Sequence, residues 1–416
     1  MGQRSTDQPD LHPWLIPFGA VIFGMMALQI SSLGFSPLLP AIQKDFQASY
    51  SQIGLFTGVY GLVAILLSVP AGLLAQKYGE KAVLLTGLLI VAIGLFVLSR
   101  AHDFILGMTG RVIWLLGYRL SFVCVMIAIA LTAPPRLKGS TMGILGSLSS
   151  LASVVGAPFG SRIEQSFGWR GSIAGFGGLA LLGLIVFAVF YRPSSEDRAP
   201  VAGGPHIPST SLKSTGPRPA YQEPVVWILA GTLGLLNIGG FTMTFFVPVV
   251  AQSVFHLRTM DAAWIISTAY IVAMFANLFC GFLADRVDRW AVMIGIAALL
   301  IPASLALLST NLLVFRIGVA MLVALGLSAT NQGYAITGAV LDGKETGPAM
   351  GIVSLGAGVY AYVGPQAIGI LRDRTGAFTV GFIVMSIAAM IALAAMIAMQ
   401  RSVSRRRMHM TQPATA

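Results

Sequence analysis

Long apolar runs separated by short polar breaks dominate the chain. Each run approaches the roughly 20 residues that a helix needs to cross a bilayer. Such runs must be helical in lipid, because an open strand edge would leave backbone groups without hydrogen bonds. We therefore predict an all-α membrane protein with twelve transmembrane helices, at residues 14–39, 52–75, 82–99, 104–131, 141–161, 171–191, 225–252, 262–283, 290–308, 312–334, 348–370 and 378–400.

The twelve runs fall into two similar sets. Residues 72–81 return, with changes, at 281–289, and residues 139–144 return at 347–352 after nearly the same shift. A repeat of about half the chain length predicts two pseudo-symmetric six-helix bundles. We place an N-terminal half at 1–191, a cytoplasmic linker at 192–224, a C-terminal half at 225–400 and a basic cytoplasmic tail at 401–416.

Composition excludes a soluble globular domain. Charged residues make up 10% of the chain, against about 25% in a typical soluble protein. The segment 192–224 is rich in Pro, Gly and Ser, which is typical of a flexible connection. The chain is thus expected to be embedded in a lipid bilayer over most of its length.

The distribution of positive charge predicts the orientation. Most of the 26 Lys and Arg residues fall on the side that carries both termini, which indicates cytoplasmic termini. The net charge of +11 then favours anchoring against acidic lipid rather than nucleic-acid binding. We expect a multi-pass protein of the plasma (inner) membrane that acts as a monomer.

Three arginines lie inside predicted spans, Arg111, Arg119 and Arg316, whereas none of the 15 acidic residues lies deep in one. An arginine at a helix centre in lipid costs at least about 2.5 kcal/mol, so it should face a wet cavity or a partner. Arg111 and Arg119 are about 12 Å apart along a helix and roughly 80° apart around it, so they can flank one cavity. Snorkelling explains Arg316, which lies near the outer end of its span.

Two cations without a buried acid favour an anionic solute. The guanidinium fork matches the shape of a carboxylate or a phosphate. The alternative for Arg111 and for Arg119 is a structural tie to backbone carbonyls or polar groups of neighbouring helices. Direct ATP drive, a metal site and a catalytic nucleophile have no motif in the sequence, so we expect neither an enzyme nor a cofactor.

The repeated loop carries a resemblance to a known family. Its first copy reads Gly72-x-Leu-Ala-x-Lys-x-Gly-x-Lys81 and its second Gly281-x-Leu-Ala-Asp-Arg-x-x-Arg289. Both copies resemble the loop signature of the major facilitator superfamily, and Arg111 followed by Gly117 resembles its pattern in the fourth helix. Within the family the chain looks most like the cyanate-permease-type and organic-anion porters.

The resemblance implies roles for particular residues. It implies that the loop residues control the change between inward- and outward-facing states, namely Gly72, Lys77, Lys81, Gly281, Asp285, Arg286 and Arg289. Gly72 and Gly281 are expected where one helix end packs closely against another. In the family, the helices that carry Gln29, Asn237 and Asn331 line the cavity, so these side chains could join Arg111 and Arg119 at the substrate. Tyr360 could stack on the solute or donate a hydrogen bond to it, and for each of the four a hydrogen bond between helices is the alternative.

Two departures weaken the loop signature. Gln76 stands where the family usually has Asp, and Asp288 stands where it usually has Gly. Three functions remain open: a secondary transporter of small anions, an efflux pump for drugs or metabolites, and a membrane scaffold or sensor that transports nothing. The missing deep carboxylate argues against proton-coupled export of cations, and the lack of an appended soluble domain argues against a sensor.

Overall fold

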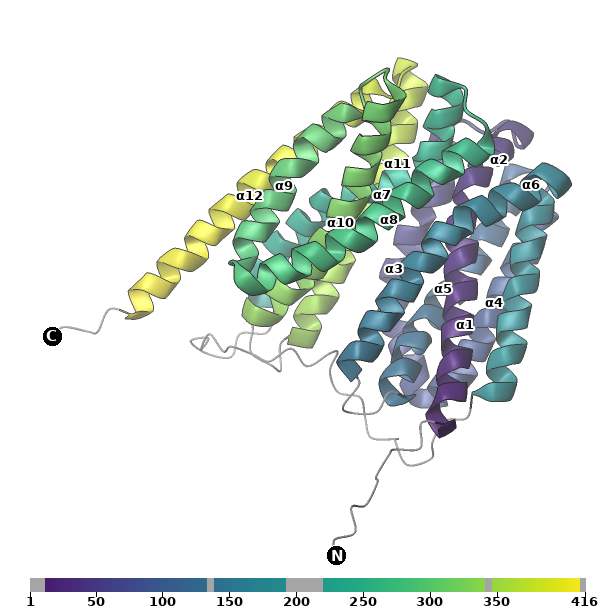
Figure 1. Ribbon diagram of the computed structural model, residues 1–416, viewed down its shortest axis with the longest axis horizontal. Coiled ribbons are helices and arrows are strands. Elements are labelled where there is room, and N and C mark those ends of the chain that lie inside the picture. Colours follow the sequence, from purple (N-terminus) through teal and green to yellow (C-terminus); the bar gives the residue numbers. More distant parts are fainter. Residues whose placement is uncertain (1–11, 133–137, 192–219, 341–345, 412–416) are drawn as a thin grey trace, which may run out of the picture.

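The computed structural model describes residues 12–132, 138–191, 220–340 and 346–411, which are helical apart from short turns (Figure 1). The elements in chain order are α1 (His12–Gly34), η1 (Ser36–Leu38), α2 (Leu39–Asp45), α3 (Tyr50–Tyr78), α4 (Glu80–Ser99), α5 (Phe104–Thr132), α6 (Lys138–Phe190), η3 (Ala220–Gln222), α7 (Pro224–Phe255), α8 (Thr259–Arg286), α9 (Arg289–Ala306), α10 (Leu312–Val340), α11 (Thr346–Thr375) and α12 (Thr379–Thr411).

These elements confirm the twelve-helix architecture within the described residues. Ten segments are long and apolar enough to cross a membrane, the first being Pro17–Asp45, which joins α1, η1 and α2. Gly168 divides α6 into two spans, because its φ of 67° and ψ of 176° break the helix. The remaining span is α11, a glycine-rich helix that packs on α3 and α7.

The first span is interrupted in a way that its apolar run did not indicate. α1 ends at Gly34, and the chain tightens into the 3-10 turn η1 before α2 begins. Pro37 lies inside this turn and has no backbone N–H to continue an α-helical ladder. The broken segment packs on the other half of the molecule, where the Ser36 hydroxyl donates to the backbone carbonyl of Thr244 at 2.5 Å.

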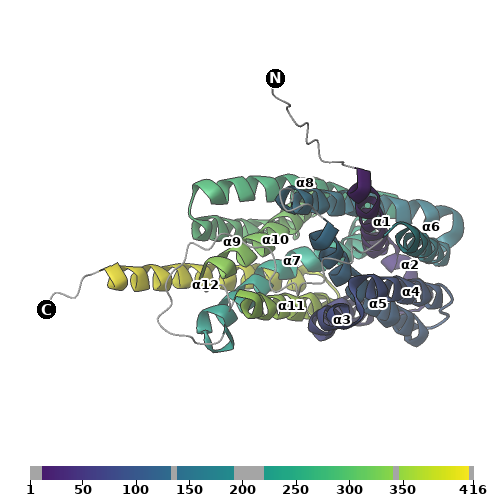
Figure 2. The same cartoon turned by 90° about the horizontal axis from the view of Figure 1, so that it is seen from below.

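The helices before and after the linker form two bundles that lie side by side (Figure 1). They meet along two helix pairs, α3 with α11 and α6 with α8 (Figure 2). The bundles converge where α3 begins and α11 ends, here called the closed end, and diverge where α1 begins and α12 ends, here called the open end (Figure 1).

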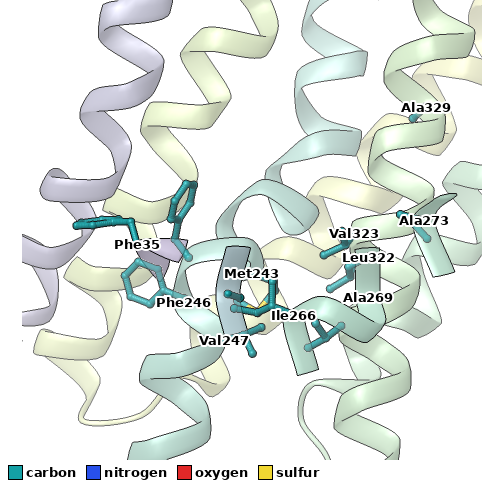
Figure 3. Close-up of a cluster of buried hydrophobic side chains, with 14 of the residues drawn as sticks. Phe35, Met243, Phe246, Val247, Ile266, Ala269, Ala273, Leu322, Val323 and Ala329 are labelled. Carbon is teal, nitrogen blue, oxygen red and sulfur yellow. The ribbon is translucent and has the colours of Figure 1, made fainter. Parts of the chain in front are cut away.

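Apolar side chains fill the inside of each bundle. In the C-terminal half, Met243 and Val247 of α7 pack near Ile266 of α8 and Leu322 of α10 (Figure 3). Phe35, which precedes η1, lies toward Phe246 of α7 across the boundary between the halves (Figure 3). Tight apolar packing therefore continues from one half into the other near the closed end.

Candidate functional site

A cavity of about 560 Å³ lies at the junction of the two halves. Its wall combines helices of both bundles, which is where bundle proteins commonly bind small molecules. The described residues around it include no Asp, Glu, Lys or Arg, but many hydroxyl, amide and aromatic groups. They are Gln29, Ser32, Leu33, Tyr60, Tyr118, Ser150, Ser153, Phe241, Thr244, Phe245, Tyr270, Met274, Asn277, Leu278, Leu327, Thr330 and Asn331.

A row of glycines brings α3 and α11 into contact on the closed side of this cavity. Cβ atoms added at Gly54, Gly58 and Gly61 would collide with backbone carbonyl oxygens of α11. Because small residues at such spacing let two backbones approach closely, α3 and α11 form a tight seam. This seam separates the cavity from the closed end.

Among the described residues, no such seam is found at the open end. Cβ atoms added at Gly72 and Gly281 would meet no atom within 4 Å, so the close packing expected at these two glycines is absent. The expectation was wrong for this conformation because both residues lie where the two halves have separated. The loop residues are thus apart in the state that the structure describes.

The cations of the repeated loop contact their own halves. Lys77 lies 5.1 Å from the ring centre of Tyr78, and Arg286 lies 4.1 Å from that of Phe282. Lys81 donates to the backbone carbonyl of Tyr191 at 2.6 Å. Arg289 donates to the backbone carbonyl of Ala335 at 3.5 Å. The side chain of Asp285 lies outside the described part of the structure.

Arg111 is enclosed in an aromatic cage and has no exposed surface. Its guanidinium carbon lies 4.1 Å from the ring centre of Phe35 and 4.3 Å from that of Trp114. Its Nε donates to the Phe56 carbonyl at 3.4 Å, while Nη1 and Nη2 have no hydrogen-bond partner. Stacking on two rings offsets part of the cost of this buried charge, and the structure places Arg111 behind the cavity rather than on its wall.

Arg119 lies closer to the cavity. It is half-buried, and its guanidinium carbon lies 5.8 Å from the ring centre of Tyr60, which is part of the cavity wall. Arg316 is exposed on the second turn of α10, as snorkelling requires. Of the three arginines within spans, Arg119 is therefore the one whose charge acts most directly on the cavity.

The four polar candidates separate into two pairs. Gln29 and Asn331 line the cavity, and Gln29 accepts a short hydrogen bond from the Tyr118 hydroxyl. Asn237 does not line it, because its amide donates to the Leu233 carbonyl and accepts from Thr330. Tyr360 packs instead against α7 at Gly234, where a Cβ would collide with its ring.

Asn277 on α8 is a cavity residue that the sequence argument missed. Its Oδ1 accepts hydrogen bonds from the Ser328 hydroxyl at 3.0 Å and from Asn331 at 3.1 Å. Because its oxygen already accepts two hydrogen bonds, the amide N–H groups are the part of this side chain that can donate. Asn237 was proposed because its helix lines the cavity in the family that the chain resembles; Asn277 is likewise an uncharged amide inside a predicted span, 262–283.

Comparisons with known proteins agree with this architecture. The model of the Major Facilitator Superfamily matches residues 21–332 and 260–409. Monocarboxylate transporter 13 of Bos taurus is 26% identical over 332 residues, which cover 75% of this chain and 71% of the relative. The probable nitrate transporter NarT of Staphylococcus carnosus is 22% identical over 383 residues, covering 91% and 93%. The crystal structure of a bacterial homolog to the human lysosomal transporter Spinster, inward-facing and unoccupied, superposes with a TM-score of 0.76 at 18% identity and covers 94% of this chain and 98% of that chain.

Proposed function

The chain belongs to the Major Facilitator Superfamily, and we propose that it is a secondary transporter that moves a small anion across a membrane by alternating access. The cavity between the halves holds the solute. The seam at the closed end and the separated open end represent one of the two states between which the protein alternates.

The balance of charge around the cavity carries the proposal. α5 contributes the permanent positive charges of Arg111 and Arg119 within a membrane-spanning helix. None of the described residues on the cavity wall is acidic. Positive charge in a low-dielectric region, beside a wall without acidic groups, raises the affinity of the cavity for an anion.

Neutral hydrogen-bonding groups then provide direct contacts. Tyr60 lies between Arg119 and the cavity, with its ring centre 5.4 Å from that of Phe241 on the opposite half. Its hydroxyl and the N–H groups of Asn277 supply donors from both halves to a carboxylate or a similar oxyanion. Contacts from both halves are what couple solute binding to their relative movement.

The names of the relatives support a small anion. The bovine relative is named for monocarboxylates and the staphylococcal relative for nitrate. Both kinds of solute are compact, singly charged and rich in oxygen acceptors. A site built from one nearby guanidinium and a few neutral donors suits that chemistry.

We place the open end at the cytoplasm and the closed end outside, in the plasma membrane. The excess of Lys and Arg on the side of the termini supports this orientation. A cysteine introduced at Ser209 should then react poorly with an impermeant maleimide applied to intact cells, and react well after the cells are made permeable. Efficient labelling of intact cells would reverse the orientation.

Efflux of a larger organic solute is the second candidate. Its support is the apolar part of the cavity wall, which includes Phe241, Phe245, Met274, Leu278 and Leu327. A pump for such compounds would tolerate loss of Arg119 and would fail when the apolar wall is made polar. A transporter of small anions would show the reverse dependence.

Uptake into proteoliposomes decides between the candidates. Labelled anions, including nitrate and a short monocarboxylate, are offered with and without a pH gradient to the wild type, Arg119→Ala and Arg119→Lys. A charge-assisted hydrogen bond contributes about 1.5–3 kcal/mol, so Arg119→Ala should weaken anion affinity roughly tenfold to a hundredfold. Arg316→Ala is the matched control, because it removes an exposed arginine about three turns before Leu327, the first residue of α10 on the cavity wall. Unchanged anion uptake by folded Arg119→Ala would refute the anion proposal.

A further inference from the structure

The N-terminus of α3 is capped by a carboxylate from the opposite half. Asp373, in the last turn of α11, accepts from the backbone N–H of Tyr50 at 3.0 Å with one oxygen and from that of Ser51 at 2.8 Å with the other. Backbone amides can only donate, so the direction of both bonds is fixed. A carboxylate at this position also interacts favourably with the positive end of the helix dipole.

Side chains of the N-terminal half cap the other backbone N–H groups at the start of α3. Ser49 and Gln52 form a reciprocal capping box at the start of α3. These local bonds leave the N–H groups of Tyr50 and Ser51 as the remaining free donors of the first turn. Asp373 satisfies them both, so the cap on α3 is complete only when the two halves are in contact.

Neighbouring side chains hold this contact in place. The Arg372 guanidinium lies 4.9 Å from the ring centre of Tyr50 and 5.1 Å from that of Phe378. The two rings pack edge to face with centres 5.5 Å apart. Gly369, one turn before Asp373, lets the backbone of α11 reach Tyr50, because a Cβ there would collide with the Tyr50 carbonyl.

The repeat places a second acid at the equivalent point. The shift that carries Gly72 onto Gly281 also carries Glu164 onto Asp373, and it carries Tyr50 onto Thr259 at the start of α8. Glu164 lies close enough to Thr259 across the second junction for that side chain to lower its pKa, against the rise caused by burial. Both junctions therefore join an acid near the end of one helix to the start of a helix in the other half.

The surroundings of Asp373 and Glu164 shift the pKa values of the two carboxyl groups in opposite directions. Burial raises the pKa of Asp373, but the hydrogen bonds from Ser51, Tyr50 and Ser49 together outweigh it and leave the pKa below its ordinary value. Burial of Glu164 raises its pKa despite the opposing effect of Thr259. The closed end thus stabilises the ionised form of Asp373 and disfavours the ionised form of Glu164.

We propose that Asp373 is a latch that holds the closed end shut by capping α3 from the opposite half. Its two acceptors and their two donors come from different halves, so the bonds exist only in the closed state and bias the equilibrium toward it. The latch concerns the movement of the halves and not the identity of the solute. It rests on transport by alternating access, as proposed above.

Distances between spin labels test the latch without any solute. Labels are attached in lipid nanodiscs to Lys44→Cys and Ala377→Cys, two exposed positions of opposite halves at the closed end. The native Cys124 and Cys280 are replaced by serine. Asp373→Asn should raise the ratio of long to short distances roughly two- to tenfold, since an exposed charge at a helix terminus contributes a modest energy.

Two controls make the result specific. Glu164→Gln removes a charge at the equivalent position, keeps a hydrogen-bonding side chain and should leave the closed end shut or tighter. Asp103→Asn removes an acid that accepts from the Leu106 N–H within its own half, and it should change nothing. Unchanged distances in Asp373→Asn, or equal opening in all three variants, would overturn the latch. Because the readout is a distance, failure of the anion proposal in uptake assays would leave this result standing.

Discussion

Replacing Gly58 by alanine should open the closed end. A Cβ at Gly58 would lie 2.8 Å from the carbonyl oxygen of Tyr362 and 3.4 Å from its Cα. The first distance is about 0.6 Å shorter than the ordinary contact of 3.4 Å. The obstructing atom belongs to the backbone and cannot rotate away, so α3 and α11 must move apart.

The size of the effect follows from this geometry. Overpacking in a well-packed interface costs typically about 1–3 kcal/mol. The gain in helix propensity from glycine to alanine applies to both conformations and cancels in the equilibrium between them. The ratio of open to closed molecules at this end should therefore rise by about 5–150-fold.

The label pair at Lys44→Cys and Ala377→Cys measures this ratio directly. Gly231→Ala on α7 is the matched control, because its Cβ would meet no atom within 4 Å. It gains the same helix propensity and should leave the distances as they are. If Gly58→Ala kept the short distance of the parent protein, the seam between α3 and α11 would not be what closes this end.

Three further outcomes are expected. Arg111→Met should match or exceed the thermal stability of the wild type, because an apolar side chain can replace a buried charge that has two unpartnered nitrogens; a large loss in a melting experiment would contradict this. Asp285→Asn should change the rate of transport more than the equilibrium affinity for solute, and a large loss of affinity with unchanged label distances would exclude a gating role. Lowering the pH from neutral should increase the closed fraction, because the closed state raises the pKa of Glu164 and therefore favours its protonated form. This stabilisation of the closed state is lost as the pH rises through that pKa. In the distance measurement, Glu164→Gln should abolish the pH dependence.

The spans were predictable because a helix that crosses a membrane needs a long run of apolar residues, and such runs are visible in the sequence. The run at 82–99 became α4, Glu80–Ser99, and the run at 225–252 became α7, Pro224–Phe255. The break at Gly168 falls in the polar stretch between the predicted spans 141–161 and 171–191. The turn after Gly34 was harder to see, because it lies inside an apolar run.

The site was less predictable, because it depends on which face of a helix each side chain occupies. Arg111 and Arg119 share one helix, yet the rings of Phe35 and Trp114 enclose the first and only the second approaches the cavity wall. Asn237 and Asn277 look alike in sequence, but the amide nitrogen of Asn237 donates to the Leu233 carbonyl, whereas Asn277 lines the cavity. Whether a side chain reaches the cavity depends on residues of other helices, and the sequence around that side chain does not indicate them.

The two junctions between the halves also bear on how such a chain arises. Under the repeat, α3 corresponds to α8 and the first span of α6 corresponds to α11, so the α3–α11 and α6–α8 pairs are equivalent. In a dimer of identical six-helix subunits they would be two copies of one isologous contact, identical by symmetry. Such a dimer cannot change one copy without changing the other. Fusion into a single chain removes that constraint, and here one copy carries an aspartate bound to backbone amides while its twin carries a half-buried glutamate.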